Sequence, residues 1–171
     1  MLDLRRRSCS GTEERSPAMT ATIATEASPR PPQGREFGLL YAEVQQFYSR
    51  QMQLFDSFEA EPWARTFTED AVFDVPTLPA PVVGRAALAS NVRRNAELHA
   101  TSGERFRHWL GMLDVQPQPD GSLHTRSYAL VYLTPRGGES KVHRVCVMED
   151  VLVHAAGTWQ VAHRLVTRDD L

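Results

Sequence analysis

The stretches FRHWLGMLDVQ (residues 106–116) and HTRSYALVYLT (residues 124–134) decide the fold class. In both, apolar and polar side chains alternate with a period of two, which is typical of half-buried β-strands. Pro119-Asp120-Gly121 lies between them and is a strong turn signal, so the two stretches predict an antiparallel hairpin. Residues 141–154 and 158–168 repeat the alternation across a short connection and predict a second pair of strands.

Upstream of the hairpin the periodicity is helical. Residues 37–60 carry a broad apolar stripe that includes Val44, Tyr48 and Met52, which predicts a deeply packed helix. The other expected elements are a short helix (61–67), a strand (71–75) and a long helix (84–100). Helices followed by a run of antiparallel strands predict the α+β class, with the helices on one face of a curved sheet. Without βαβ alternation or a GxGxxG motif, a dinucleotide-binding fold is disfavoured.

The length of 171 residues favours one domain, at 36–171, preceded by a tail. Residues 1–35 are rich in Ser, Pro and Arg and are predicted to be disordered, and Met19 is a candidate alternative translation start. A formal net charge of −2 with scattered arginines disfavours nucleic-acid binding. The sequence has no run of 18 apolar residues, so no membrane span is expected.

The two cysteines, Cys9 and Cys146, have no ligand spacing or disulfide framework, and this usage indicates a reducing cytoplasm. The histidines form no HxxxH or histidine–carboxylate set, so no metal site is expected. Cys146 lies in an apolar strand without a base beside it, which argues against a nucleophilic mechanism.

The turn type sets the expected register of the hairpin. If Asp120-Gly121 is a two-residue turn, the numbers of paired residues sum to 241 and His108 faces Leu133. One face of the hairpin then collects Phe106, His108, Leu110, Met112, Ala129, Val131 and Leu133, which suits the wall of a pocket. The opposite face carries Trp109, Tyr128 and Tyr132, which suits an interface between subunits. In the last strand, His163 shares a face with Val161 and is expected to pack within the sheet.

The element order and four stretches resemble the nuclear transport factor 2-like superfamily, and within it the SnoaL-like branch. The stretches are FYSRQMQLFDSFEAEPWARTFTEDAVFDVP (47–76), GRAAL (84–88), RHWLGML (107–113) and TWQVAHRLVTRDD (158–170). That branch includes polyketide cyclases, scytalone dehydratase and the small subunits of ring-hydroxylating dioxygenases. The resemblance implies a cone-shaped α+β barrel with a pocket between its helices and sheet, and a homodimer formed through the outer sheet face.

The resemblance also implies site residues. RHWLG matches the strand on which dehydratase-like proteins carry an acid/base histidine, so His108 is the candidate base. Glu59 matches the carboxylate four residues before the tryptophan Trp63, and Asp56 is its rival as the partner of His108. Tyr48 is expected to position a substrate oxygen. The expected substrate-binding residues are Trp63, Phe73, Asp74, Leu110, Met112, Val131, Cys146 and Met148. The second pocket histidine of the dehydratase pattern is missing, which leaves a lone base.

These features predict a cofactor-free cyclase, dehydratase or isomerase. Its substrate would be a small aromatic or polyketide-like molecule of a secondary-metabolite pathway such as antibiotic biosynthesis. The alternative is a non-catalytic small subunit, or an accessory ligand-binding partner, of an oxygenase.

Overall fold

The computed structural model describes residues 34–171. The predicted disordered tail and the candidate start at Met19 lie outside the described residues, apart from the last two positions of the tail. Of these two, Arg35 is already the first residue of a helix, α1 (Arg35–Asp56).

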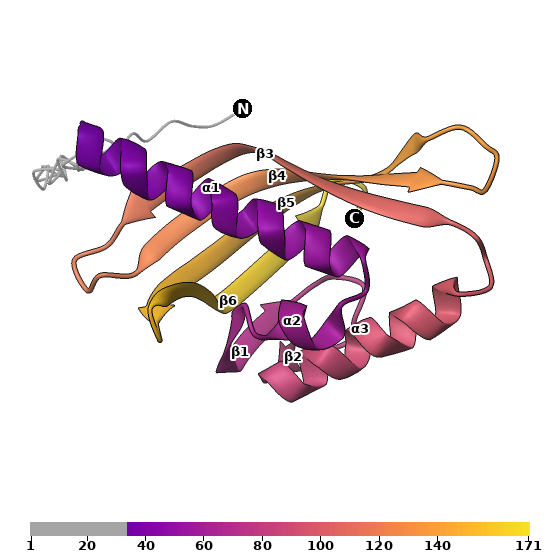
Figure 1. The fold of residues 1–171 in the computed structure, drawn as a ribbon, viewed down its shortest axis with the longest axis horizontal. Coiled ribbons are helices and arrows are strands. Elements are labelled where there is room, and N and C mark those ends of the chain that lie inside the picture. The colour runs from indigo at the N-terminus through magenta and orange to yellow at the C-terminus, as the bar shows by residue number, and fades with distance from the viewer. Residues whose placement is uncertain (1–33) are drawn as a thin grey trace, which may run out of the picture. The chain divides into compact units, whose positions relative to one another are not determined.

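The α+β class is confirmed. The elements after α1 are α2 (Ala60–Ala64), β1 (Phe67–Asp74), β2 (Val82–Val83), α3 (Arg85–His99), β3 (Arg105–Pro117), β4 (Leu123–Thr134), β5 (Lys141–Ala155) and β6 (Thr158–Arg168). The strands form one curved, open sheet in the order β2-β1-β6-β5-β4-β3, shown in Figure 1. All neighbours are antiparallel except β1 and β6, which run parallel. The two-residue β2 was not predicted, and β1 begins four residues earlier than expected.

Helix α1 packs on the sheet along β3, while α2 and α3 pack against each other near β1 (Figure 1). Val44, Tyr48 and Met52 recur every four residues on α1 and are buried, as the helical period requires. Val44 and Tyr48 join a core cluster between the helices and the inner face of the sheet. Its other buried members are Ala60, Trp63, Ala64, Phe67, Ala71, Leu88, Ala89, Val92, Val115, Leu123, Met148, Leu152 and Val161.

The end of α1 is sharply defined. Phe58 adopts a left-handed backbone with φ 57°, and the backbone N–H of Glu59 donates to the carbonyl of Leu54 at 3.0 Å. A left-handed residue directly after the last turn commonly ends a helix, although glycine is the residue usually found there. Asp56 is therefore the last residue of α1, and its side chain lies where the helix meets β3.

The hairpin register differs from the prediction in two places. The β3–β4 connection is a loop with Gly121 at φ 84°, so that Pro117 pairs with Leu123 and the paired numbers sum to 240. Further along, Met112 and Leu113 lie opposite one residue of β4, and this bulge lowers the sum to 239. His108 therefore pairs with Val131, and its predicted pairing with Leu133 is wrong by two positions.

A second bulge changes which residues of β6 point inward. Val151 pairs with His163 but Leu152 pairs with Val161, so Ala162 is an extra residue in β6. The bulge reverses the alternation, and Arg164 is buried at 2% exposure while His163 is exposed. The prediction that His163 packs within the sheet is wrong for this reason.

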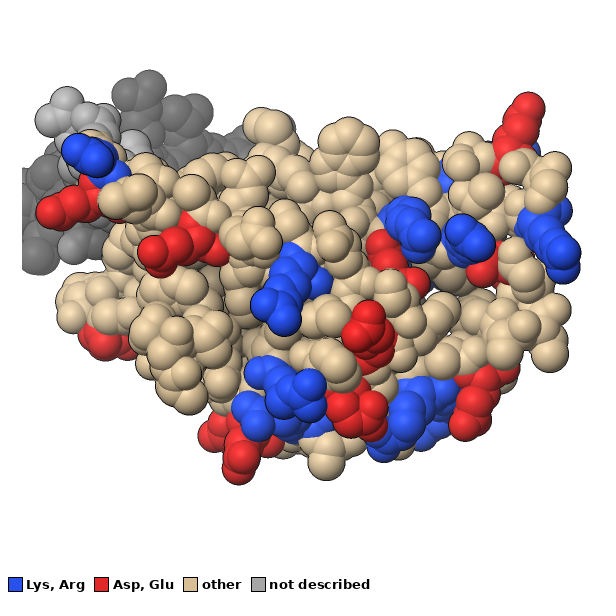
Figure 2. All heavy atoms as spheres, viewed as in Figure 1, with Lys and Arg blue, Asp and Glu red and all other residues tan. Residues whose placement is uncertain are grey.

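On the face of the molecule in Figure 2, basic and acidic side chains are interspersed and no field of one sign forms. Within residues 34–171, no helix combines the length and the apolar composition that a membrane crossing requires.

Candidate active site

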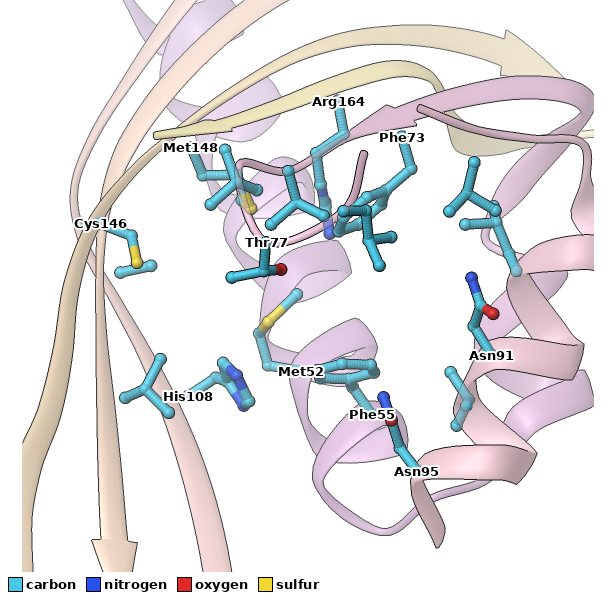
Figure 3. Close-up of a pocket in the computed structure, with 18 of the residues that line it drawn as sticks. Met52, Phe55, Phe73, Thr77, Asn91, Asn95, His108, Cys146, Met148 and Arg164 are labelled. Atoms are coloured by element: carbon cyan, nitrogen blue, oxygen red, sulfur yellow. The ribbon is translucent and has the colours of Figure 1, made fainter. Parts of the chain in front are cut away.

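A cavity of about 380 Å³ opens between the inner face of the sheet and the helices (Figure 3). This volume lies within the range of small-molecule pockets. Most of its wall is apolar, and the apolar lining includes Met52, Phe55, Trp63, Phe73, Leu88, Leu110, Val131, Met148 and Val166. The polar lining is sparse and comprises Thr77, Asn91, Arg94, Asn95, His108, Arg144, Cys146, Arg164 and Arg168.

His108 reaches this cavity from β3 and is paired with Asp56 at the end of α1. The imidazole Nδ1 lies 2.6 Å from Oδ1 of Asp56, and the backbone N–H of His108 donates to Oδ2 at 3.1 Å. The side chains are 20% and 8% exposed, so the pair is largely shielded from water. The ring of Phe55 meets the imidazole edge-on at 5.0 Å between centroids and limits its rotation.

The pairing with Asp56 determines which imidazole nitrogen can act as a base. A carboxylate at Nδ1 accepts a hydrogen bond and so favours the tautomer with its proton on that nitrogen. Nε2 then carries the lone pair, and it has no hydrogen-bond partner among residues 34–171. The arrangement gives His108 a free basic nitrogen and a fixed orientation at the pocket wall.

A second cavity, a groove of about 490 Å³, lies on the other side of this histidine, between α1 and β3. His108, Met52 and Leu110 line both cavities, whereas Asp56 lines only the groove. His108 thus lies in the wall between the pocket and the groove, and its carboxylate partner is reached from the groove.

A polar network that the sequence did not predict lies at another part of the pocket wall. Arg164 donates from Nε to Oδ1 of Asp150 at 2.8 Å and from Nη2 to Oδ2 at 2.7 Å, a two-point ion pair. The same Nη2 donates to Oε1 of Gln51 at 2.6 Å. Tyr48 donates to Asp150 at 2.8 Å, and its hydroxyl lies 2.5 Å from Oγ1 of Thr125. The pair is 2% and 0% exposed, so the two charges compensate each other away from water.

Burial and neighbouring charges raise the pKa values of three titrating groups near the site. Burial and the neighbouring Asp150 carboxylate raise the pKa of Tyr48 well above its ordinary value. Burial disfavours the charged form of Arg164, but the attraction of Asp150 outweighs it and the pKa of the guanidinium is raised. Burial also raises the pKa of the Cys146 thiol, although Arg168 and Arg144 act in the opposite direction. At neutral pH, Tyr48 therefore stays a phenol and Cys146 stays a thiol.

The structure places four predicted site residues away from the cavity lining. Glu59 is exposed beyond the end of α1, which ends at Asp56, and the hydrogen bonds of His108 to a carboxylate go to Asp56 instead. Met112 lies in the bulge with φ 52° and is 79% exposed, so it faces away from the pocket. Asp74 is not part of the cavity lining. Tyr48 is also absent from that lining, and its hydroxyl is engaged with Asp150 and Thr125.

The other predicted substrate-binding residues line the cavity: Trp63, Phe73, Leu110, Val131, Cys146 and Met148. Asp150 could have been found, because it follows Cys146 and Met148 in the alternation of β5 and so faces inward. A carboxylate in that position needs a cation. Arg164 could not be found as that cation, since the bulge at Ala162 carries no clear sequence signal.

No group of three or more potential metal ligands occurs in the part of the chain that the structure describes. Cys146, the cysteine within that part, is free and buried.

Comparison with family models gives the description SnoaL-like domain over residues 39–165, which is most of the chain. The chain belongs to the SnoaL-like family. Aln2 from a Streptomyces species is 32% identical, with a TM-score of 0.73 over 82% of this chain and 96% of its own. ActVI-ORFA from Streptomyces coelicolor is 33% identical, with a TM-score of 0.70 over 77% and 98%. A Catenulispora acidiphila protein, solved in complex with S-DNPA, is 37% identical, with a TM-score of 0.67 over 78% and 96%.

More distant solved structures share the fold of this SnoaL-like chain. They include a putative scytalone dehydratase and the β subunit of a putative aromatic-ring-hydroxylating dioxygenase, both from Novosphingobium aromaticivorans and both 16% identical with a TM-score of 0.64. No curated protein matches the sequence.

Proposed function

We propose that this SnoaL-like protein is an enzyme that moves a proton on a small, oxygenated aromatic or polyketide-like ligand. The observation that carries the proposal is the Asp56 carboxylate 2.6 Å from Nδ1 of His108, at the wall of a largely apolar cavity. The reaction classes that fit are cyclisation, dehydration and isomerisation, carried out by the side chains of the pocket.

His108 acts through Nε2 while Asp56 holds Nδ1. Nε2 takes a proton from a carbon next to a carbonyl, and the electron pair of the broken C–H bond moves onto the carbonyl oxygen as an enolate. In an isomerisation the imidazolium returns the proton to another carbon, and in a dehydration it protonates the departing hydroxyl. In a cyclisation the enolate carbon attacks a second carbonyl, and the imidazolium protonates the new alkoxide. Asp56 stays ionised and stabilises the imidazolium throughout.

The lining supports an aromatic ligand. Phe55, Trp63 and Phe73 offer ring surfaces, and Leu110 and Val131 give a flat aliphatic wall on the sheet. A pocket of this kind excludes water and limits the rotation of a bound ligand, so part of the rate acceleration comes from orientation. The relative from Catenulispora acidiphila, which was solved with S-DNPA, supports a pocket that takes a small ligand.

Exchange of carbon-bound hydrogen tests the proposal without knowledge of the natural substrate. The probe is 1-tetralone, a bicyclic ketone with two hydrogens next to its carbonyl, and NMR follows their replacement by deuterium in D2O. We expect catalysed exchange by the full chain and a loss of roughly 10²- to 10⁴-fold in a folded His108→Ala variant. Exchange that is equal in the two proteins would rule out His108 as the base.

The accessory-subunit alternative has weaker support. The histidine–carboxylate pair leaves Nε2 of His108 free at the wall of a cavity, which serves acid/base chemistry, whereas joining α1 to β3 requires no free basic nitrogen. Copurification from the native host separates the two cases, because a stable complex with a larger oxygenase subunit would favour the accessory role.

We also propose a homodimer through the outer sheet face, in a reducing cytoplasm. Trp109 and Tyr128 are 65% and 46% exposed on this face. Val145 of β5 lies in the same cross-strand row as Trp109, because both pair with Leu130 of β4. Tyr132 lies beside Val142, which is 50% exposed. An apolar, aromatic surface of this kind is typical of protein interfaces.

A further inference from the structure

Arg164 has more hydrogen-bond donors than its neighbours use. A guanidinium group carries five N–H donors. Nε donates to Asp150, and Nη2 donates to both Asp150 and Gln51, which accounts for three of the five. The remaining two belong to Nη1, which has no acceptor among the described residues of the chain. Because the side chain is only 2% exposed, these donors are reached mainly through the cavity that the side chain lines.

The unused donors belong to a side chain that lines the cavity. Figure 3 shows Arg164 descending from β6 with its nitrogen end toward the interior of the pocket, while His108 enters from β3 at the opposite side. Met52 lies between them in this view, with Phe55 beside it (Figure 3). A ligand in this cavity would therefore meet a base at one end and a buried cation at the other.

The cation is fixed before any ligand arrives. Asp150 holds it at two points, and the guanidinium carbon lies 5.2 Å from the ring centroid of Phe67 and 5.8 Å from that of Phe73. A donor that is already oriented by its neighbours needs little reorganisation when negative charge develops nearby. The ion pair with Asp150 also keeps the group charged despite its burial.

We propose that Nη1 of Arg164 is the oxyanion-binding group of this site: it donates to the ligand oxygen that becomes negative when His108 removes a proton. This inference rests on the proposed function, since it names the second catalytic residue of the same reaction. The electron pair released from the C–H bond ends on the ligand oxygen, where the two N–H groups of Nη1 stabilise it. The natural ligand accordingly carries a carbonyl oxygen that is conjugated with the carbon deprotonated by His108 and that lies on the side of the ligand facing Arg164.

Ionisation of bound 2-naphthol measures this interaction without any turnover. Its hydroxyl becomes an oxyanion on a bicyclic ring, and its absorbance spectrum reports the ionised fraction as the pH is varied. A cationic donor at the oxygen favours the charged form, so binding should lower the pKa of the naphthol by roughly one unit, a tenfold gain in acidity. We expect this shift in the full chain and in His108→Ala.

Two variants remove the donors in different ways. Arg164→Lys keeps a cation against Asp150 but has no second nitrogen for the ligand, and Arg164→Met with Asp150→Asn removes both buried charges together. We expect the shift to disappear in each variant that circular dichroism shows to be folded. Arg93→Met is the matched control, because Arg93 pairs with Glu61 on the surface and does not line the cavity. It should keep the full shift.

The outcomes separate this inference from the proposed function. The inference is overturned if the naphthol does not bind, if binding leaves its pKa unchanged, or if the shift survives in the folded Arg164 variants. The proposed function instead depends on exchange from 1-tetralone and its loss in His108→Ala. A naphthol shift that requires Arg164, in a protein that catalyses no exchange, would therefore overturn the function and leave Arg164 as an anion-binding residue.

Discussion

The Asp56 carboxylate accepts two hydrogen bonds from the same residue, one from the backbone N–H of His108 and one from its ring at Nδ1. One carboxylate thereby joins the end of α1 to β3 and sets the tautomer of the imidazole. A neutral side chain of the same shape could keep the link between α1 and β3 but would alter the tautomer of the imidazole.

Asp56→Asn should therefore reduce catalysis more than stability. The amide retains the shape of the carboxylate, but it no longer stabilises the imidazolium and can hold the ring in the wrong tautomer. We expect 1-tetralone exchange to fall by roughly 10²-fold, because the variant keeps the base but loses its orienting charge. Exchange rates measured under saturating probe, with thermal unfolding in parallel, check this expectation.

Glu59→Gln is the matched control for Asp56→Asn. It makes the same chemical change on the rival carboxylate, which is exposed three residues further along. Exchange should stay at the level of the unmodified chain. A larger loss from Glu59→Gln than from Asp56→Asn would contradict the assignment of Asp56 as the partner of His108.

Tyr48→Phe should destabilise the fold and change its response to alkali. The hydroxyl donates to the buried Asp150 carboxylate, so its removal should lower the free energy of unfolding by about 1–3 kcal/mol. The folded-state pKa of Tyr48 lies above the unfolded value, so its contribution is complete below about pH 10. That contribution is lost as the pH rises further, because only the unfolded chain then ionises readily.

Urea unfolding at a series of pH values tests both expectations for Tyr48. The alkaline loss of stability should be smaller in Tyr48→Phe than in the unmodified chain. Tyr41→Phe removes a hydroxyl that donates to the carbonyl of Leu113, and it should keep the full alkaline loss. The same alkaline slope in all three proteins would show that the Tyr48 hydroxyl is not the group responsible.

Cys146 should react slowly with alkylating reagents. Its thiol is buried at 5% exposure with a raised pKa, so the reactive thiolate is scarce at neutral pH and increases as the pH rises. In a Cys9→Ser chain, iodoacetamide should label Cys146 more slowly than it labels free glutathione, as followed by intact mass. Saturating 2-naphthol should slow the labelling further, because Cys146 lines the cavity. Fast labelling that naphthol leaves unchanged would contradict this placement.

Trp109→Glu should convert a dimer into a monomer in sedimentation velocity. It places a charge within the proposed interface, where the side chain is 65% exposed in the isolated chain. Val83→Glu adds the same charge at a 61% exposed position on β2 and should leave the dimer intact. A monomer before any substitution, or a dimer that survives Trp109→Glu, would remove the outer sheet face as the interface.

Met112→Gly should raise the free energy of unfolding by about 1 kcal/mol. Met112 adopts φ 52°, a left-handed conformation that strains every side chain except glycine, and its exposed side chain contributes little packing. Leu113→Gly is the contrasting variant and should be destabilising, because Leu113 packs against the core. Denaturant unfolding of both variants tests the bulge, and a destabilised Met112→Gly would contradict its geometry.

The β3–β4 hairpin shows which structural features could be predicted from the sequence. Alternation and the turn signal predicted both strands, and they placed His108 and Leu110 on the inner face, where the structure has them. The pairing itself was wrong by two positions, one from the loop and one from the bulge. Because two single shifts restore the alternation, the predicted faces hold for residues 106–110, whereas Leu113, predicted on the outer face, lies beyond the bulge and packs against the core. Met112 lies inside the bulge and faces away from the pocket, contrary to the prediction.

The polar residues of the site could not be predicted as well from the sequence. The choice between Asp56 and Glu59 depends on where α1 stops, and that depends on a left-handed phenylalanine, Phe58, which propensity does not favour. Arg164 depends on the bulge at Ala162, where packing against neighbouring strands overrides the period of two. Local pattern predicted the apolar wall, whereas tertiary contacts determine its charged members.

The Ala162 bulge makes the length of β6 as important as its composition. Deletion of one residue between Val161 and Arg164 would turn the guanidinium to the outer surface and leave Asp150 as a buried charge without a counterion. The loop at residues 118–122 can change length without reversing any strand, since Pro119, Asp120 and Gly121 at its tip are exposed. Recombination or loop grafting in this domain can therefore exchange hairpin loops freely, but β6 must be transferred with its residue count unchanged.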